Sequence, residues 1–162
     1  MSERMIGVGD FHATPHMREL VNYVLDSGRI SHGPLCGELE KKWSSIHGCR
    51  FGILSSSGTD SIHVAIQSLK EVHGWHDGDE IITAASTFVA TVNSILLNNL
   101  TPVLVDVEDG YYGIDPYAIE DAVTPRTRAV LIVHLFGLPC NYDVVGVARD
   151  YDLALVEDSC ET

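Results

Sequence analysis

From residue 51 onward the chain carries short apolar runs that alternate with longer amphipathic stretches. The runs are rich in β-branched residues and lack polar alternation, which is typical of strands covered on both faces. The stretches between them repeat apolar residues at helical spacing. The pattern therefore predicts α/β architecture, a three-layer sandwich with a mainly parallel sheet between helices. The predicted strands are residues 51–54, 80–83, 102–105, 129–133 and 154–156, and the predicted helices are residues 61–72, 87–98, 116–123 and 143–150.

The pattern before residue 51 is different. Thr14-Pro15 supplies a helix cap and a proline at the first helical position, and apolar residues follow at helical spacing as far as Gly28. Residues 35–46 combine mixed charge with apolar spacing, which predicts a surface helix. Residues 1–13 show little periodicity and predict an extended arm. We therefore expect an N-terminal arm and helices over residues 1–50 and one further domain, without an internal repeat, over residues 51–162.

The turn at residues 55–60 reads Ser-Ser-Ser-Gly-Thr-Asp and joins a predicted strand to a predicted helix. The first turn of a helix has unpaired N–H groups and the positive end of the dipole, so such a turn is a ready phosphate site. Gly58 lets the backbone approach a ligand closely, and the hydroxyls of Ser57 and Thr59 add donors. The alternative is that Ser57 or Thr59 only caps the helix, and the turn alone leaves both interpretations open.

Two further polar segments follow predicted strands, at the edge of a parallel sheet where ligands gather. Phe88, in Ser86-Thr87-Phe88, could cover a flat heterocycle, although packing in the core is the alternative. Asp158, directly after the last strand, could keep a ring nitrogen protonated, because a close negative charge favours the charged form. It could equally be a helix cap, or a ribose or metal contact. Pyridoxal phosphate requires a phosphate grip, a ring cover and an acid of this kind.

Charge and hydropathy narrow the possible partners. The chain has 10 Lys and Arg against 23 Asp and Glu, a formal net charge of −13, which would repel the phosphate backbone of nucleic acid. A bound anion must therefore be held by local dipoles. No apolar run is long enough to span a bilayer, and the N-terminus lacks the basic-then-apolar order of a signal peptide. These features predict a soluble, cytoplasmic protein that binds neither nucleic acid nor membrane.

The cysteines and histidines give no pattern of a metal site. The cysteines are widely spread without a Cys-x-x-Cys pair, so buried thiols are expected. The pairs His12/His16 and His73/His76 have ligand-like spacing, but no second pair of ligands matches either of them. We predict that no metal is bound and that His73 and His76 are solvated. The four cysteines are Cys36, Cys49, Cys140 and Cys160.

Several segments, taken in order, resemble the DegT/StrS-type sugar aminotransferases, which are pyridoxal-phosphate enzymes of fold type I. The resemblance runs over nearly the whole chain. It implies that residues 51–162 are part of the cofactor-binding large domain, without the C-terminal part of that domain and without the small domain. The segments are Gly58-Thr59-Asp60, Gly78-Asp79-Glu80, Thr87-Phe88-Val89-Ala90-Thr91, Pro102-Val103 with Val105-Asp106-Val107, Thr124-Pro125-Arg126-Thr127, His134-Leu135-Phe136-Gly137 and Glu157-Asp158.

The resemblance implies a role for each site residue. The turn at residues 57–60 would bind the cofactor phosphate, and Phe88 would stack on the pyridine ring. Asp158 would be the catalytic residue whose carboxylate pairs with the protonated ring nitrogen. Glu161 stands where many family members have Gln or His near the phenolic oxygen of the cofactor, so its role is open. The implied cofactor-binding residues are Ser57, Gly58, Thr59, Asp60, Phe88, Asp158 and Glu161.

The resemblance also implies a catalytic lysine beyond this chain. In the family that lysine follows the Asp158 motif and forms a Schiff base with the cofactor. The lysines of the chain are Lys41, Lys42 and Lys70, and none of them matches that position. We therefore expect the front part of a larger enzyme, which does not catalyse transamination on its own.

The implied activity is transfer of an amino group, with glutamate expected as donor, to a nucleotide-linked keto sugar in amino-sugar or polysaccharide biosynthesis by a homodimer. One alternative is a nucleotide-sugar 3-dehydratase of the same family, in which histidine replaces the lysine. Some dehydratases carry a Cys-Glu or Cys-Asp pair like Cys160-Glu161. Another alternative is a non-catalytic domain that binds a phosphate or nucleotide sugar without a dinucleotide-binding glycine motif or a P-loop.

Overall fold

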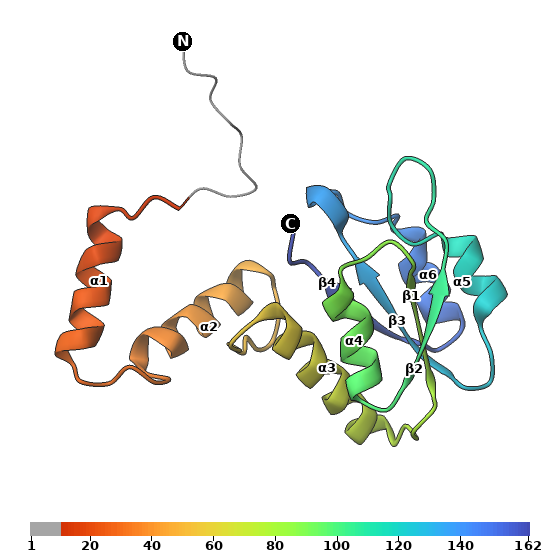
Figure 1. Ribbon diagram of the computed structural model, residues 1–162, viewed down its shortest axis with the longest axis horizontal. Helices are drawn as coiled ribbons and strands as arrows, with labels where there is room; N and C mark the ends of the chain where they lie inside the picture. The colour runs from red at the N-terminus through yellow and green to blue at the C-terminus, as the bar shows by residue number, and fades with distance from the viewer. Residues whose placement is uncertain (1–10) are drawn as a thin grey trace, which may run out of the picture. The chain divides into compact units, whose positions relative to one another are not determined.

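The computed structural model describes residues 11–162 in two compact units, of which the first ends at Leu54 and the second is Ser55–Thr162 (Figure 1). Most of the arm predicted over residues 1–13 lies outside the described residues. The first unit contains the two helices that the sequence predicts, α1 (Pro15–Asp26) and α2 (Pro34–Ile46). Helix α1 begins as expected, because the Thr14 hydroxyl accepts a hydrogen bond from the Met17 N–H and Pro15 is the first helical residue.

The strand predicted over residues 51–54 is wrong. This segment makes no strand ladder within residues 11–162, and the side chains of Phe51 and Ile53 are 70% and 83% exposed. Its backbone instead meets α2, where the Leu54 N–H donates to Glu40 Oε1 at 3.0 Å. A Cβ at Gly52 would lie 2.4 Å from the Glu40 carbonyl oxygen. A run of apolar, β-branched residues suits a strand, but a segment becomes a strand only where a neighbouring strand accepts and donates its backbone hydrogen bonds.

The second unit is built on a sheet of four parallel strands in the order β2-β1-β3-β4. The central strands β1 (Glu80–Ala84) and β3 (Thr127–Val133) are buried along almost their whole length. The edge strands β2 (Thr101–Val105) and β4 (Ala154–Asp158) are partly exposed. The other four predicted strands are therefore confirmed, and the expected burial on both faces holds fully for the central pair.

Helices cover both faces of this sheet (Figure 1). Helices α3 (Gly58–His73) and α4 (Val89–Leu97) pack on one face, and α5 (Pro116–Ala122) and α6 (Asp143–Asp150) on the other. Side chains along a strand alternate between the two cores, so Leu131 of β3 joins the first core and Val130 the second. The predicted three-layer α/β sandwich is confirmed.

The pairing of the strands shows where their C-terminal and N-terminal ends lie. We call these two ends of the sheet the carboxyl edge and the amino edge. Ala84 pairs with Val105, and Val133 pairs with Asp158, so the segments after these residues leave the sheet at its carboxyl edge. At the other end, Glu80 of β1 pairs with both Thr101 and Thr127 at the amino edge. The segments after β1, β3 and β4 therefore converge, as expected for a parallel sheet.

Helix α3 begins three residues earlier than the predicted start at residue 61. Ser57 has extended backbone angles, and its hydroxyl accepts a hydrogen bond from the Asp60 N–H at 3.1 Å, which makes Ser57 the N-cap. Gly58 and Thr59 consequently belong to the first turn of the helix. Helix α4 begins at Val89, with Phe88 in extended conformation just before it.

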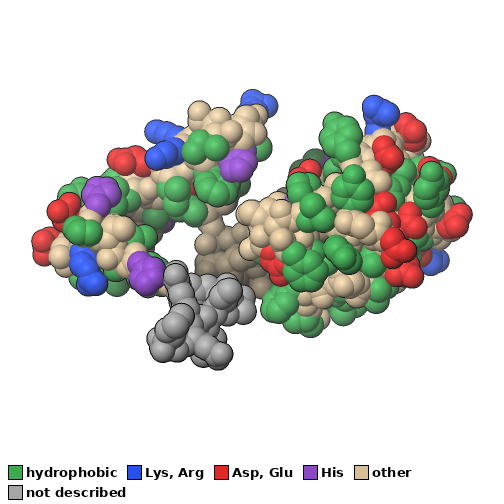
Figure 2. Space-filling view, turned by 90° about the horizontal axis from the view of Figure 1, so that it is seen from above, with side chains coloured by type: hydrophobic (Ala, Val, Ile, Leu, Met, Phe, Trp, Pro, Cys, Tyr) green, Lys and Arg blue, Asp and Glu red, His purple; other side chains and the backbone are tan. Residues whose placement is uncertain are grey.

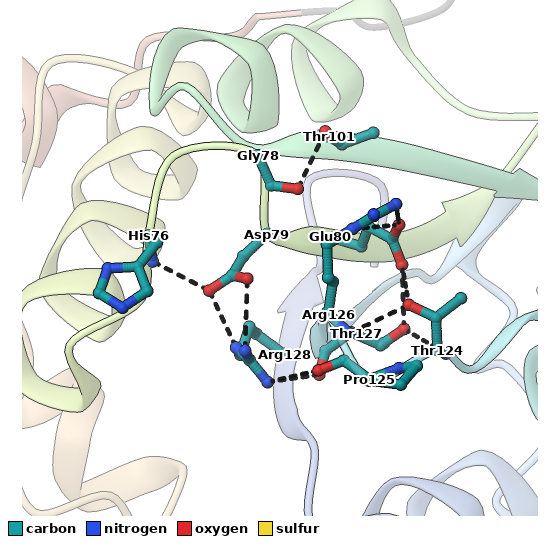
Figure 3. A network of polar contacts seen from close by, with 10 residues as sticks. All are labelled: His76, Gly78, Asp79, Glu80, Thr101, Thr124, Pro125, Arg126, Thr127 and Arg128. Atoms are coloured by element: carbon teal, nitrogen blue, oxygen red, sulfur yellow. Dashed lines mark hydrogen bonds and ion pairs between the residues drawn. The ribbon is translucent and has the colours of Figure 1, made fainter.

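The amino edge is closed by an interlocked set of side chains that we call the amino-edge clasp: Asp79, Glu80, Thr124, Arg126 and Arg128 (Figure 3). Glu80, only 4% exposed, accepts hydrogen bonds from the Thr124 hydroxyl and from Arg126 Nε and Nη2 at 3.1 and 2.5 Å. The Thr124 bond contributes most to lowering the pKa of Glu80, and Arg126 adds to it despite the opposing effect of burial.

Asp79 completes the clasp beside Glu80 (Figure 3). Its carboxylate accepts hydrogen bonds from the His76 N–H at 2.9 Å and from Arg128 Nε and Nη2 at 2.9 and 3.3 Å. Burial by itself would raise the pKa of Asp79, but these donors outweigh it and the pKa is lowered. Two of the segments that carry the family resemblance, residues 78–80 and 124–127, thus bind one another.

The four cysteines are less buried than the sequence predicts. Cys49 and Cys160 are exposed and Cys36 and Cys140 are half-buried, so the expected burial of the thiols is wrong. All four lie in helix ends or loops rather than in the strands that form the cores. His73 and His76 are exposed, as expected. Figure 2 shows exposed hydrophobic side chains beside many acidic ones on the visible face of residues 55–162.

Within residues 11–162, no helix combines the length and apolar character needed to cross a membrane.

Candidate functional site

A pocket of about 270 Å³ opens at the carboxyl edge of the sheet. It is formed by the first turn of α3, the start of α4 and the segments that follow β3 and β4. Elements that are distant in sequence therefore meet at one place. The lining residues are Gly58, Thr59, Ile62, Phe88, Ala90, Val133, Leu135, Asp158, Cys160 and Glu161.

The first turn of α3 brings free hydrogen-bond donors to this pocket. Within the described part of the chain, the N–H groups of Gly58 and Thr59 and the Thr59 hydroxyl donate to no protein atom. They stand at the positive end of a helix of 16 residues. An anion bound here would meet two backbone donors, one hydroxyl and the helix dipole.

Ser57 and Asp60 do not line the pocket. Ser57 caps α3, and its hydroxyl also donates to Asp60 Oδ2 at 2.9 Å. The same carboxylate oxygen accepts from the Ser56 hydroxyl, and these hydrogen bonds, with Ser56 first, lower the pKa of Asp60. Both side chains are therefore occupied in shaping the turn, which resolves the open question of the cap in favour of Ser57.

Gly58 lies against Cys160, on the wall of the pocket. A Cβ at residue 58 would lie 2.6 Å from Cys160 Sγ, so only glycine leaves this space to the cysteine as it stands. The thiol has a pKa raised to about 11, because its side chain hydrogen-bonds to the Asp158 carboxylate and because of burial. Cys160 therefore stays a neutral thiol at physiological pH, between the phosphate-type turn and the acid.

Asp158 is the last residue of β4 and is 5% exposed. Its Oδ1 accepts a hydrogen bond from the Cys160 N–H at 3.2 Å, and its Oδ2 accepts one from the Thr91 hydroxyl at 3.0 Å. A carboxylate oxygen has two lone pairs, which leaves acceptor capacity on both oxygens beside the pocket.

Phe88 lies beside the pocket with its side chain 68% exposed, so the alternative of core packing is wrong. Its extended backbone immediately precedes α4, whose first residues are apolar and pack inward at Ala90. An aromatic side chain held at this place presents one face to a ligand.

Glu161 lines the pocket and is bonded to the segment after β3. Its Oε2 accepts a hydrogen bond from the Phe136 N–H at 2.7 Å. Phe136 has a positive φ of 59°, a conformation that costs energy for a residue with a side chain. Glu161 thus holds the short helix η1 (Leu135–Gly137), whose Leu135 is buried against the pocket.

The charge of the pocket comes from acids alone. Of the lining side chains in the described residues, Asp158 and Glu161 are the charged ones, and no Lys or Arg is among them. An anion bound at α3 would therefore be held by dipoles and neutral donors, which is the arrangement that the net charge of the chain predicts. No group of three or more His, Cys, Asp and Glu side chains in residues 11–162 could hold a metal ion.

The structure brings five of the seven predicted site residues together and leaves Ser57 and Asp60 at the cap. Thr91 and Cys160 also contact Asp158, and neither has a role that the sequence predicts. A signal for Thr91 is the spacing of Thr87 and Thr91, which lie four residues apart and would share one face of the helix predicted over residues 87–98. The five that meet are Gly58, Thr59, Phe88, Asp158 and Glu161.

Comparison with known proteins adds the family. The model of the DegT/DnrJ/EryC1/StrS aminotransferase family matches residues 13–162. The chain belongs to this family. The resemblance drawn from short motifs is therefore confirmed over almost the whole length of the chain.

Solved structures share the fold. NtdA from Bacillus subtilis, solved with bound cofactor PMP, is 32% identical to this chain, with a TM-score of 0.83. The match covers 99% of this chain and 38% of the NtdA chain. The GDP-4-keto-6-deoxy-D-mannose-3-dehydratase of E. coli, solved with bound hydrated PLP, is 27% identical, with coverages of 98% and 42% and a TM-score of 0.88. DesI, solved in the presence of its TDP-sugar product, is 34% identical, with coverages of 88% and 35% and a TM-score of 0.74.

This chain thus spans less than half the length of these relatives. The expectations of a fold type I architecture and of a family dependent on pyridoxal phosphate are confirmed. The family contains both aminotransferases and a nucleotide-sugar dehydratase.

Proposed function

We propose that the protein containing this chain is a pyridoxal-phosphate-dependent aminotransferase that acts on a nucleotide-linked keto sugar. Glutamate is the proposed amino donor, and the proposed assembly is a cytoplasmic homodimer. Residues 51–162 would form part of the cofactor-binding large domain. The observation that carries the proposal is the single pocket that joins the first turn of α3, Phe88 and the buried Asp158.

The residues of this pocket fit the cofactor. Its phosphate needs an anion site, and the unpaired N–H groups of Gly58 and Thr59 with the Thr59 hydroxyl provide one. Its ring needs a cover, which the exposed Phe88 provides. Its ring nitrogen needs an acid, and Asp158 has unused lone pairs at the pocket.

Each of these residues would have a defined task in the reaction. When bound, pyridoxal phosphate withdraws electrons from the substrate carbon next to the amino group. Asp158 would keep the proton on the ring nitrogen, because a close negative charge stabilises the protonated ring. Phe88 would exclude water from one face of the ring, and α3 would anchor the phosphate so that the ring keeps its orientation. Glu161 would hold η1 against the pocket.

A 3-dehydratase is the second candidate, supported by the likeness to the E. coli dehydratase over 98% of this chain. The two activities differ in what leaves the sugar. A transaminase replaces a keto oxygen by an amino group and converts glutamate to its keto acid, whereas a dehydratase removes a hydroxyl group. Supplying the full-length protein with a nucleotide keto sugar and glutamate separates them, because stoichiometric formation of 2-oxoglutarate with an amino sugar supports transamination. A deoxy sugar product supports the dehydratase.

The cofactor assignment is tested first on the full-length protein. Addition of pyridoxal phosphate should produce a visible absorption band that remains after removal of free cofactor. A complete lack of spectral change would contradict the assignment. In addition, Asp158→Ala should leave the fold intact, as judged by circular dichroism, but abolish turnover, and normal turnover in this variant would show that Asp158 does not serve the ring nitrogen.

A further inference from the structure

Thr87, two residues before α4, and Thr91, in the first turn of α4, form a chain of hydroxyl groups that ends on Asp158. The Thr87 hydroxyl donates to Thr91 Oγ1 at 3.0 Å, and the Thr91 hydroxyl donates to Asp158 Oδ2 at 3.0 Å. Thr91 is fully buried, and Asp158 is 5% exposed. A carboxylate without a proton only accepts hydrogen bonds, so the direction of the chain is set from Thr87 towards Asp158.

The hydroxyl of Thr91 has no local task in its own helix. A Ser or Thr inside a helix commonly donates to the carbonyl four residues earlier, as Ser94 of the same helix does to the Ala90 carbonyl at 2.8 Å. Thr91 instead donates to a residue 67 positions away, on another element. The helix therefore does not account for a buried hydroxyl at this position, whereas the acid does.

The Thr91 hydroxyl and the Cys160 N–H reach opposite oxygens of Asp158. Oδ2 is held by Thr91 and Oδ1 by the Cys160 N–H. Two donors on opposite oxygens fix the rotation of the carboxylate about its Cβ–Cγ bond. The remaining lone pairs then have a constant orientation at the pocket, which is what a partner for a planar ring requires.

From these contacts we propose that Thr91 is a positioning residue that acts through Asp158, with Thr87 as its support. This inference rests on the proposed function, since it concerns the acid assigned to the ring nitrogen. A hydrogen bond donated to a carboxylate stabilises the anion against the neutral acid, and burial works in the opposite sense. Thr91 thus favours a proton that stays on the ring nitrogen and does not pass to Asp158.

The same turn of α4 also holds the proposed ring cover. Phe88 lies between Thr87 and Thr91 in the sequence and directly precedes the helix. The hydroxyl chain therefore ties the start of α4 to the end of β4. As a consequence, the aromatic cover and the acid keep a fixed separation.

The test compares Thr91→Val with Thr91→Ser in the full-length protein loaded with pyridoxal phosphate that carries ¹⁵N in the ring. Valine has nearly the shape of threonine but lacks the donor, and serine keeps it. In Thr91→Val the ¹⁵N resonance should move towards that of a neutral pyridine. The Kd for the cofactor should rise about tenfold, as expected for the loss of one hydrogen bond to a charged group.

Thr91→Ser should match the wild type in both measurements. A resonance and a Kd in Thr91→Val that equal those of the wild type would overturn the inference. If Thr91→Val does not fold, Thr87→Val decides, because it removes only the donor to Thr91 and should shift the resonance in the same direction by a smaller amount. An unshifted resonance in that variant would also overturn it.

The wild-type spectrum separates this inference from the proposed function. A wild-type protein that binds no pyridoxal phosphate contradicts the proposed function, and with it the role of Thr91. A wild-type protein that binds the cofactor with a protonated ring nitrogen, together with an unaffected Thr91→Val variant, contradicts the role of Thr91 alone.

Discussion

At the amino edge of the sheet, Asp79 accepts three hydrogen bonds and Glu80 accepts four, and two arginines neutralise them (Figure 3). At the carboxyl edge, Asp158 is equally buried and accepts hydrogen bonds from the Thr91 hydroxyl, the Cys160 N–H and the Cys160 thiol, but no arginine or lysine of residues 11–162 lines its pocket. Three acids with similar burial thus differ in whether an arginine neutralises them.

The difference shows what each group of family motifs does. Polar side chains of residues 78–80 and 124–127 hydrogen-bond to one another, so we infer that these two motifs preserve the fold. In the other group of motifs, Gly58 and Thr59 leave donors unused at the pocket, and Asp158 leaves acceptor capacity there. Free donors at the start of a helix and free acceptor capacity on a carboxylate suit a ligand that completes them.

The largest expected effect on stability comes from breaking the amino-edge clasp. Glu80→Ala removes the acceptor shared by Thr124 and Arg126 and should destabilise the full-length protein by about 2 to 3 kcal/mol, the range for hydrogen bonds to a charged group. The shift of the urea midpoint measures it. Cofactor affinity of the folded variant should stay the same, and a parallel loss of affinity would show that the two edges are not independent.

Acid should open the same clasp. The folded pKa values of Asp79 and Glu80 lie below their ordinary values of 3.8 and 4.5. Their contribution to stability is therefore present above those ordinary values and is lost as the pH falls through the lowered ones. The urea midpoint should fall between about pH 5 and pH 3, and the double variant Asp79→Asn/Glu80→Gln should show a flatter profile. An equally steep profile in the variant would mean that other acids cause the loss.

Predictability from sequence follows the same division. The four strands of the sheet and the six α-helices of residues 11–162 are predictable because their apolar spacing and their turn or cap residues are local patterns. The strand predicted over residues 51–54 does not form because a strand needs an adjacent strand to pair with, and the local pattern carries no information about that neighbour. The predicted start of α3 is three residues late because the capping role of Ser57 depends on its extended backbone angles, which the residue type alone does not determine.

The candidate site was predictable only where a residue type indicates its chemistry. Gly58, Phe88 and Asp158 follow strands and suit a phosphorylated ring. The contact between Thr91 and Asp158 spans 67 residues, and no local pattern reports it. Likewise, the pairing of Glu80 with Arg126 becomes visible only when β1 and β3 are adjacent.

A smaller effect is expected at the pocket wall. Gly58→Ala places a Cβ 2.6 Å from the present position of Cys160 Sγ, so the sulfur or the helix must shift. The Kd of the full-length protein for pyridoxal phosphate should rise about tenfold, the effect of one lost hydrogen bond to a charged group. The double variant Gly58→Ala/Cys160→Ala frees the space and should recover most of the affinity. No recovery would show that the glycine serves the ligand directly and not the approach of Cys160.

The smallest effect is expected for Glu161→Gln. Glutamine keeps a side-chain oxygen that accepts the Phe136 N–H, so η1 should stay in place and the Kd for the cofactor should change by no more than about twofold. Glu161→Ala removes that acceptor and serves as the matched control, with a larger increase. Equal losses in both variants would indicate that the charge of Glu161 contacts the ligand.

One paired titration tests the difference between the edges most directly. Pyridoxal phosphate is added to full-length Asp158→Asn and Glu80→Gln, which each neutralise one buried acid, and the urea midpoint is measured for both. For Asp158→Asn we expect a Kd that is higher by about tenfold or more, with little change in the urea midpoint. For Glu80→Gln we expect a lower urea midpoint and an unchanged Kd. Equal affinities in the two variants would contradict these expectations.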